Sequence, residues 1–154
     1  MLIGSIIFGP FGDLFGRIPV LRVGLIISIL LFGFNTYFQS SLIQTYVCFF
    51  GLGLLSSVRL NLGFIYGAEV LKEKTANVVG SLALSIDAFT MIVASIFFMY
   101  ISKSWLELYT IYFSLLVIPL LISFIMPESP KYLLQKKLFT QARESFNRIA
   151  RMNS

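Results

Sequence analysis

Histidine is absent from the 154-residue chain, and cysteine occurs once, at Cys48. Without histidine the chain cannot form a His/Cys metal cluster, a Ser-His or Cys-His nucleophile pair, or a histidine acid-base group. The single cysteine lies in an apolar run, cannot form an intramolecular disulfide and fits a small buried hydrophobe. No G-x-x-x-x-G-K-[ST] loop for ATP is present either. These absences predict a protein that is not an enzyme and uses no cofactor and no metal.

Charged residues are also scarce. They make up 12% of the chain against about 25% in an ordinary soluble domain, while 57% of the residues are hydrophobic. This composition predicts an integral, multi-pass membrane protein in contact with the lipid bilayer. The net charge of +5 does not indicate a nucleic-acid partner, because the basic residues cluster between apolar runs, where they suit anionic inner-leaflet lipids.

Four apolar runs reach the roughly 20 residues that a membrane-spanning helix needs: 19–38, 42–66, 78–100 and 106–126. A fifth run, 1–11, covers half a span. It fits the cytoplasmic half of a helix that begins upstream, in a fragment or behind a misplaced start codon, with a re-entrant stub as the alternative. The predicted fold is all-α: a transmembrane bundle of about five spans over 1–126, followed by a cytoplasmic amphipathic segment over 127–154.

The distribution of basic residues predicts the orientation of the bundle. One side carries Lys103 alone, and Arg59 lies inside a span. The other side carries all the remaining basic residues: Arg17, Arg22, Lys72, Lys74, Lys131, Lys136, Lys137, Arg143, Arg148 and Arg151. Because cytoplasmic loops are enriched in Lys and Arg, this second side and the C-terminal tail are predicted to be cytoplasmic.

Two segments on that side have recognisable local patterns. The stretch 9–22, GPFGDLFGRIPVLR, is predicted to be a hinge in which Gly9, Gly12 and Gly16 let two helix ends come close together. After Pro127, Ser129 is a suitable N-cap and Pro130 a suitable first helical residue. The apolar positions that follow recur every three or four residues, which predicts one amphipathic helix: Leu134, Leu138, Ala142, Phe146 and Ile149.

Three motifs give the chain a family resemblance. The pattern G-x-x-x-D-x-x-G-R around Asp13 and Arg17 resembles the loop after the second helix of the major facilitator superfamily, although Leu14 replaces the usual basic residue. GAEVLKEK, with Glu69, resembles the signature after the fourth helix. PESPKYLL, from Pro127, resembles the signature after the sixth helix in sugar porters and organic cation and anion transporters.

The resemblance covers helices two to six and the start of the central cytoplasmic loop. It implies an N-terminal half of a secondary carrier, in which two six-helix halves move a small organic solute by alternating access. A chain of this length would act with another half or as a homo-oligomer. The alternative is a truncated half that transports nothing and binds or regulates a full-length carrier.

Six charged residues lie at the predicted cytoplasmic helix ends: Asp13, Arg17, Glu69, Lys74, Glu128 and Lys131. We hypothesise that they form a gating network that holds those ends together in one conformation and breaks in the other. The alternative is a set of solvated loop charges, whose exposed pairs contribute only about 0–1 kcal/mol.

Two ionisable residues fall within spans. Arg59 and Asp87 have similar predicted depths, and an unpaired charge there costs at least about 2.5–3.5 kcal/mol. We therefore expect either an ion pair between them or a position of Arg59 along the substrate path, with a purely structural pair as the competing interpretation. Asn35 and Asn61 are further candidates for solute contact, and hydrogen bonding between helices is the alternative for both.

Overall fold

The computed structural model describes residues 2–38, 41–71 and 73–152. The regular structure of these residues is entirely helical, as predicted. Some residues of the sequence-based predictions lie outside them: Met1, residues 39 and 40 between the first two long runs, Lys72, and residues 153 and 154 at the end of the predicted segment 127–154.

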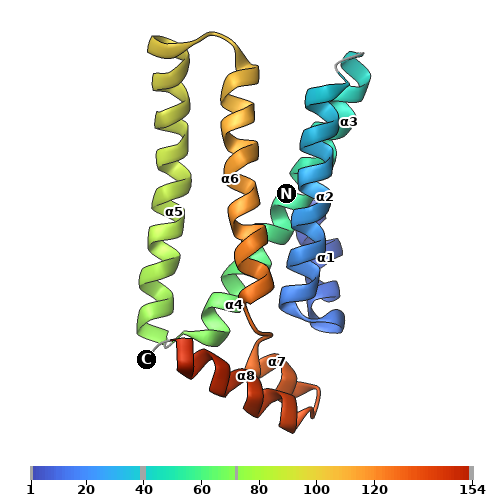
Figure 1. Ribbon diagram of the computed structural model, residues 1–154, viewed down its shortest axis with the longest axis vertical. Helices are drawn as coiled ribbons and strands as arrows, with labels where there is room; N and C mark the ends of the chain where they lie inside the picture. Colours follow the sequence, from blue (N-terminus) through green and yellow to red (C-terminus); the bar gives the residue numbers. More distant parts are fainter. Residues whose placement is uncertain (1, 39–40, 72, 153–154) are drawn as a thin grey trace.

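Four helical rods are long and apolar enough to cross a membrane. They are α2 (Arg17–Tyr37), a continuous rod of α3 (Leu42–Ser57), η1 (Val58–Leu62) and α4 (Gly63–Val70), a second rod of α5 (Glu73–Ile96) and η2 (Phe97–Ile101), and α6 (Trp105–Ile125). A helix of 21 residues, such as α2, spans about 31 Å, which matches a hydrocarbon core of about 30 Å. These rods confirm the predicted polytopic bundle (Figure 1). The described residues contain four candidate spans where about five were predicted, because the first apolar run forms only a short helix.

The predicted hinge is much shorter than its sequence suggests. Helix α1 (Leu2–Phe15) continues through Pro10 and Gly12, and the chain turns at Gly16, whose φ is +105°. In an apolar bundle, neighbouring helices compensate for glycine and proline inside a helix. The prediction of a turn over the whole of 9–22 was therefore wrong, because it gave these residues the breaking effect that they have in soluble proteins.

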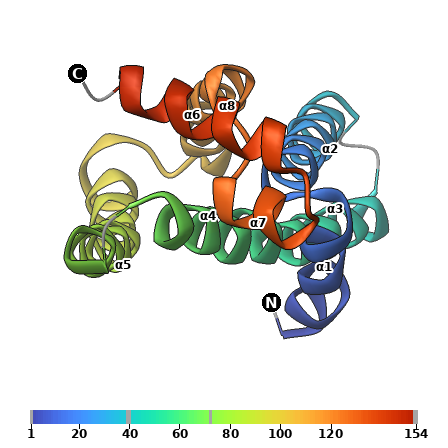
Figure 2. The same ribbon diagram turned by 90° about the horizontal axis from the view of Figure 1, so that it is seen from below.

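Close packing between α1, α2 and the long rod forms the core. Leu55, Val58 and Leu62 are buried against Phe8 of α1 and two residues of α2, Val20 and Leu31. Glycines permit this approach: a Cβ at Gly24 would lie 2.8 Å from Val58 Cγ1. In contrast, α5 stands at the edge of the bundle (Figure 2). Of an apolar 18-residue stretch of the α5–η2 rod, 6% is buried inside the protein.

The segment after α6 folds back as two helices, α7 (Pro130–Gln135) and α8 (Phe139–Met152), where one was predicted. The predicted start is confirmed, since the Ser129 side chain accepts a hydrogen bond from the Tyr132 backbone N–H at 3.3 Å. The chain reverses at Lys137, which has a φ of 60°. The reversal buries Tyr132 and Leu133 against Ala142, a contact that the periodicity of a single straight helix cannot express.

Candidate functional site

Arg17, the first residue of α2, binds two carboxylates from different helices. Its Nη2 lies 3.1 Å from Glu69 Oε1 on α4, and both side chains are more than nine-tenths buried. Its Nη1 forms an ion pair with Asp13 on α1, whose side chain is 70% exposed. The guanidinium therefore joins the ends of α1, α2 and α4 at a single point, and the link to Glu69 is the one shielded from solvent.

Glu128 caps the same helix through its carboxylate. It accepts hydrogen bonds from the backbone N–H groups of Arg17 at 3.0 Å, Ile18 at 3.2 Å and Ser129 at 2.9 Å. The first two donors belong to the first turn of α2 and have no partner within the helix, and the helix dipole there also favours a negative charge. Gly16 gives the carboxylate room, because a Cβ there would lie 2.5 Å from Glu128 Oε2.

Two tyrosine hydroxyls extend the cluster. Tyr132 on α7 donates to Leu14 O at the end of α1, and Tyr66 on α4 donates to Pro127 O, both at 2.9 Å. Burial, reinforced by the charge of Glu128, raises the pKa of Tyr132, so its phenol keeps the proton that it donates. Tyr132 was not predicted from the sequence, since an aromatic residue two positions after a proline gives no signal for such a contact.

Lys74 and Lys131 were predicted to belong to the network, but both are exposed. Neither forms an ion pair within 2–38, 41–71 and 73–152. Arg22, whose sequence position indicated only the orientation of the bundle, lies at a contact between helices instead. Its Nη2 donates to Ser123 O at 2.8 Å, and its guanidinium lies 4.6 Å from the centre of the Phe124 ring, so it joins α2 to α6.

Arg59 and Asp87 form no ion pair in the described part of the chain. Arg59 is partly buried and lines a cavity of about 240 Å³ between η1–α4 and α5, whereas exposed Asp87 lines a neighbouring cavity of about 510 Å³. Leu60 and Phe64 border both cavities. The two charges therefore line different cavities that share part of their walls, and the expected pairing is not found.

Asn61 and Asn35 occupy different surroundings. Asn61 also lines the 510 Å³ cavity and donates to Ser5 Oγ on α1 at 2.8 Å. Asn35 is buried between α2 and α6, where it donates to the Tyr109 hydroxyl at 3.3 Å. The structure therefore brings Asn61 and Asp87 to one cavity and leaves Asn35 away from it, in a helix-to-helix hydrogen bond.

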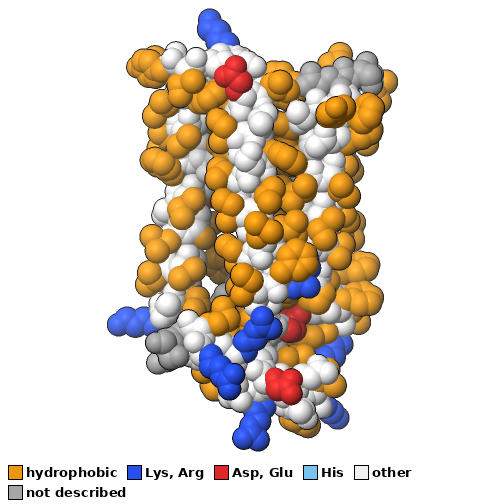
Figure 3. Space-filling view, viewed as in Figure 1, with side chains coloured by type: hydrophobic (Ala, Val, Ile, Leu, Met, Phe, Trp, Pro, Cys, Tyr) orange, Lys and Arg blue, Asp and Glu red, His pale blue; other side chains and the backbone are white. Residues whose placement is uncertain are grey.

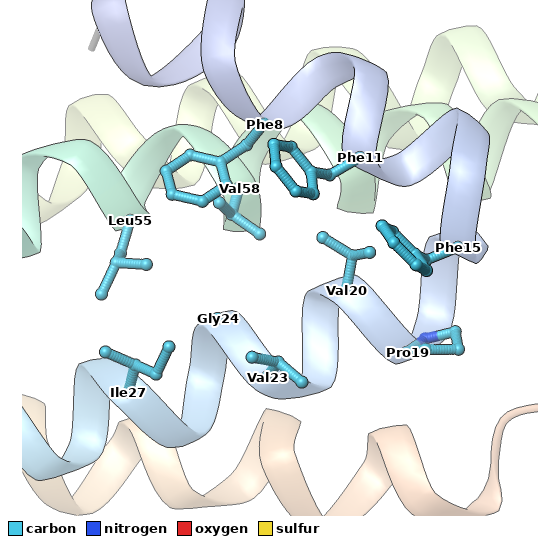
Figure 4. Close-up of a pocket in the computed structure, with 10 residues that line it drawn as sticks. All are labelled: Phe8, Phe11, Phe15, Pro19, Val20, Val23, Gly24, Ile27, Leu55 and Val58. Atoms are coloured by element: carbon cyan, nitrogen blue, oxygen red, sulfur yellow. The ribbon is translucent and has the colours of Figure 1, made fainter.

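A third cavity, of about 420 Å³, opens between α1 and α2 (Figure 4). Every side chain around it is apolar: Phe8, Phe11, Phe15, Pro19, Val20, Val23, Ile27, Leu55 and Val58 surround it together with Gly24. Because specific solute sites combine apolar walls with a few placed polar groups, this cavity lacks the means to orient a polar solute.

Comparison with known proteins gives these contacts a context. The profile of the sugar (and other) transporter family matches residues 1–153. The chain belongs to this family. Two proteins similar to this chain are named solute carrier family 22 member 15-like. The one from Xenopus laevis is 29% identical over 99% of the chain and 31% of its own length. The one from Xenopus tropicalis is 31% identical over 92% of the chain and 29% of its own length.

The chain thus spans about a third of the length of the relatives it matches. No solved structure matches it. The family membership confirms the resemblance to major facilitator carriers of the organic-ion and sugar-porter type that the three motifs indicated.

Proposed function

We propose that this chain is part of a secondary carrier that moves a small organic solute across a membrane by alternating access. In this proposal 1–126 supplies helices two to six of a major facilitator fold, and 127–154 begins the central cytoplasmic loop. A second half, or another copy of the chain, completes the translocation path. The contact between Arg17 and the two distant motifs around Glu69 and Glu128 carries the proposal.

The proposed role of the cluster is to hold one of two conformations. Arg17, Glu69 and Glu128 come from three separate segments, and their contacts lie at one end of the bundle. Buried charged contacts of this kind stabilise the conformation that forms them and give nothing to one that separates them. Breaking the contacts would therefore favour the conformation in which these helix ends move apart.

The 510 Å³ cavity is our candidate for part of the solute path. It combines the Asp87 carboxylate, the Asn61 amide and the Ser5 hydroxyl with apolar walls. It also adjoins η1, a π-helical turn, and such turns occur frequently at functional sites. Arg59 lies in that turn and faces the smaller neighbouring cavity, so the two charges would meet a solute from different sides of Phe64.

The proposed orientation places α7 and α8 in the cytoplasm. Figure 3 shows Lys and Arg gathered at the end of the bundle where these helices lie, whereas Lys103 lies in the connection between η2 and α6. To test this, a protease site is inserted after Met152, and sealed right-side-out vesicles are treated with external protease. We expect the site to resist cleavage. Cleavage in intact vesicles would contradict the proposed orientation.

Uptake measurements test the gating role. We expect Asp13→Asn and Arg17→Gln, introduced in the complete carrier, to change the uptake of radiolabelled organic cations, organic anions or sugars at equal surface expression. Lys131→Gln is the matched control, because Lys131 is exposed and near Glu128 in sequence. Uptake kinetics that are identical in all three variants would remove the gating role, and absence of uptake for every solute class would remove the carrier function.

A further inference from the structure

We propose that α8 is a membrane-surface helix that docks onto anionic phospholipid headgroups. The proposal does not depend on which solute is carried or on whether the chain transports alone. It combines the position of α8, the composition of its exposed faces and its charge.

The position of α8 is at the level of the helix ends. Four residues separate the end of α6 at Ile125 from the start of α7 at Pro130. Tyr132 on α7 bonds to Leu14 O near the end of α1, and the Ser145 hydroxyl on α8 bonds to Glu128 O. These contacts fix α7 and α8 where the spans leave the hydrocarbon core. Figure 1 shows α8 lying across the direction of the spans, and Figure 2 shows it crossing below the end of α6.

The apolar face of α8 is wider than its contact with the bundle. Ala142 and Ser145 are buried, and Ile149 is partly buried. Phe139 and Phe146 lie seven residues apart, on the same side of the helix as Ala142, yet remain 67% and 65% exposed. Large aromatic side chains this exposed, on a helix next to the bilayer, are typical of helices that insert their apolar face into the headgroup boundary.

The charges around this apolar face indicate which lipids it contacts. The segment 127–154 has six basic residues against two acidic ones, and Glu128 is already bonded to backbone N–H groups. Arg143 and Arg148 are both exposed, and at about 100° per residue they lie about 60° and about 160° around the helix from Phe146, on its polar side. Basic residues beside an inserted apolar face attract anionic lipid headgroups, so charge complementarity favours an anionic surface over a neutral one.

Tryptophan fluorescence can test the proposal on the whole chain, because Trp105 is its single tryptophan. In a Trp105→Phe background, a tryptophan is introduced by Phe146→Trp or, as the matched control, by Asn147→Trp. The variants are reconstituted in phosphatidylcholine vesicles with brominated acyl chains, with or without phosphatidylserine. Neighbouring helix positions differ by about 100°, so the two probes report on the proposed docked face and on the polar face.

We expect bromolipid quenching to be at least about twofold stronger at 146 than at 147, as insertion of one face predicts. Phosphatidylserine should increase the quenching at 146, and the added pair Arg143→Gln and Arg148→Gln should abolish that increase. Far-UV circular dichroism verifies that each variant keeps its helix content. Equal quenching at both positions, or quenching at 146 that ignores lipid charge, overturns the proposal. A probe at 146 shielded from both bromolipid and aqueous acrylamide would also overturn it, because protein would then cover this face.

Discussion

Replacing Glu128 with glutamine removes the charge from the α2 cap and preserves the size of the side chain. The carboxylate accepts hydrogen bonds from the backbone N–H groups of Arg17, Ile18 and Ser129 at 2.9–3.2 Å. Hydrogen bonds to a charged group contribute about 1.5–3 kcal/mol each, and the helix dipole adds about 0.3–1 kcal/mol. Glutamine keeps one carbonyl acceptor but turns an NH₂ donor toward the remaining N–H groups. We therefore expect Glu128→Gln to lower the free energy of unfolding by about 2 kcal/mol, which is roughly a thirtyfold change in the equilibrium constant.

The measurement is a denaturant titration of the chain in mixed micelles, followed by the fluorescence of Trp105. This residue lies near the opposite end of the bundle, with its ring centre 5.7 Å from that of Tyr109, so its signal reports loss of the whole fold. Glu144→Gln is the matched control, since Glu144 is exposed on α8 and its neutralisation removes the same charge. The reasoning is refuted if the two variants have equal unfolding free energies, because the cap would then contribute no more than a surface charge.

Three further variants test neighbouring contacts in the same titration. Gly16→Ala should cost about 1–3 kcal/mol, because φ +105° is strained for alanine and the new Cβ would meet Glu128; Gly9→Ala, where a Cβ meets nothing within 4 Å, should cost less. Ser129→Ala should cost about 1 kcal/mol through loss of the α7 N-cap, and an unchanged stability would contradict the cap. Tyr132→Phe should cost about 1 kcal/mol. Because the folded state raises the pKa of Tyr132, the wild type should lose this stabilisation as pH rises above about 10, a loss that the phenylalanine variant should not show.

The lengths of the apolar runs predicted the long spans well, since run length and apolarity are local properties of the chain. Apolarity alone predicted the helix ends poorly. The apolar run beginning at residue 78 suggested a long loop before it, whereas α5 begins at Glu73. A helix can continue into the headgroup region with charged residues, and apolarity alone does not detect that extension. The reversal at Lys137 escaped prediction for a different reason, because it depends on packing of Leu133 against Ala142.

The charged motifs were predictable as groups, but their partners were not. Arg17, Glu69 and Glu128 were predicted at helix ends, but the prediction treated all six charges as equivalent members of one network. In the structure Glu128 bonds to backbone N–H groups, and Lys131 remains exposed. Which charge bonds to which group depends on the angle at which helices meet across more than 100 residues of sequence, and no local pattern contains that angle.

The positions of the contacts indicate how a release of the charge cluster would spread. Helices α2 and α6 are joined at two levels, by Arg22 to Ser123 O and by Asn35 to Tyr109. Helix α4 is joined to its surroundings near one end, through Glu69 and Tyr66, and α5 follows it with little burial. The π turn η1 separates α4 from the well-packed α3. If the proposed gating role holds, loss of the Arg17–Glu69 contact frees α4 and α5 to move about η1 while α2 and α6 stay together. The cavity that contains Asp87 would then change shape, because its walls come from both sides of that turn.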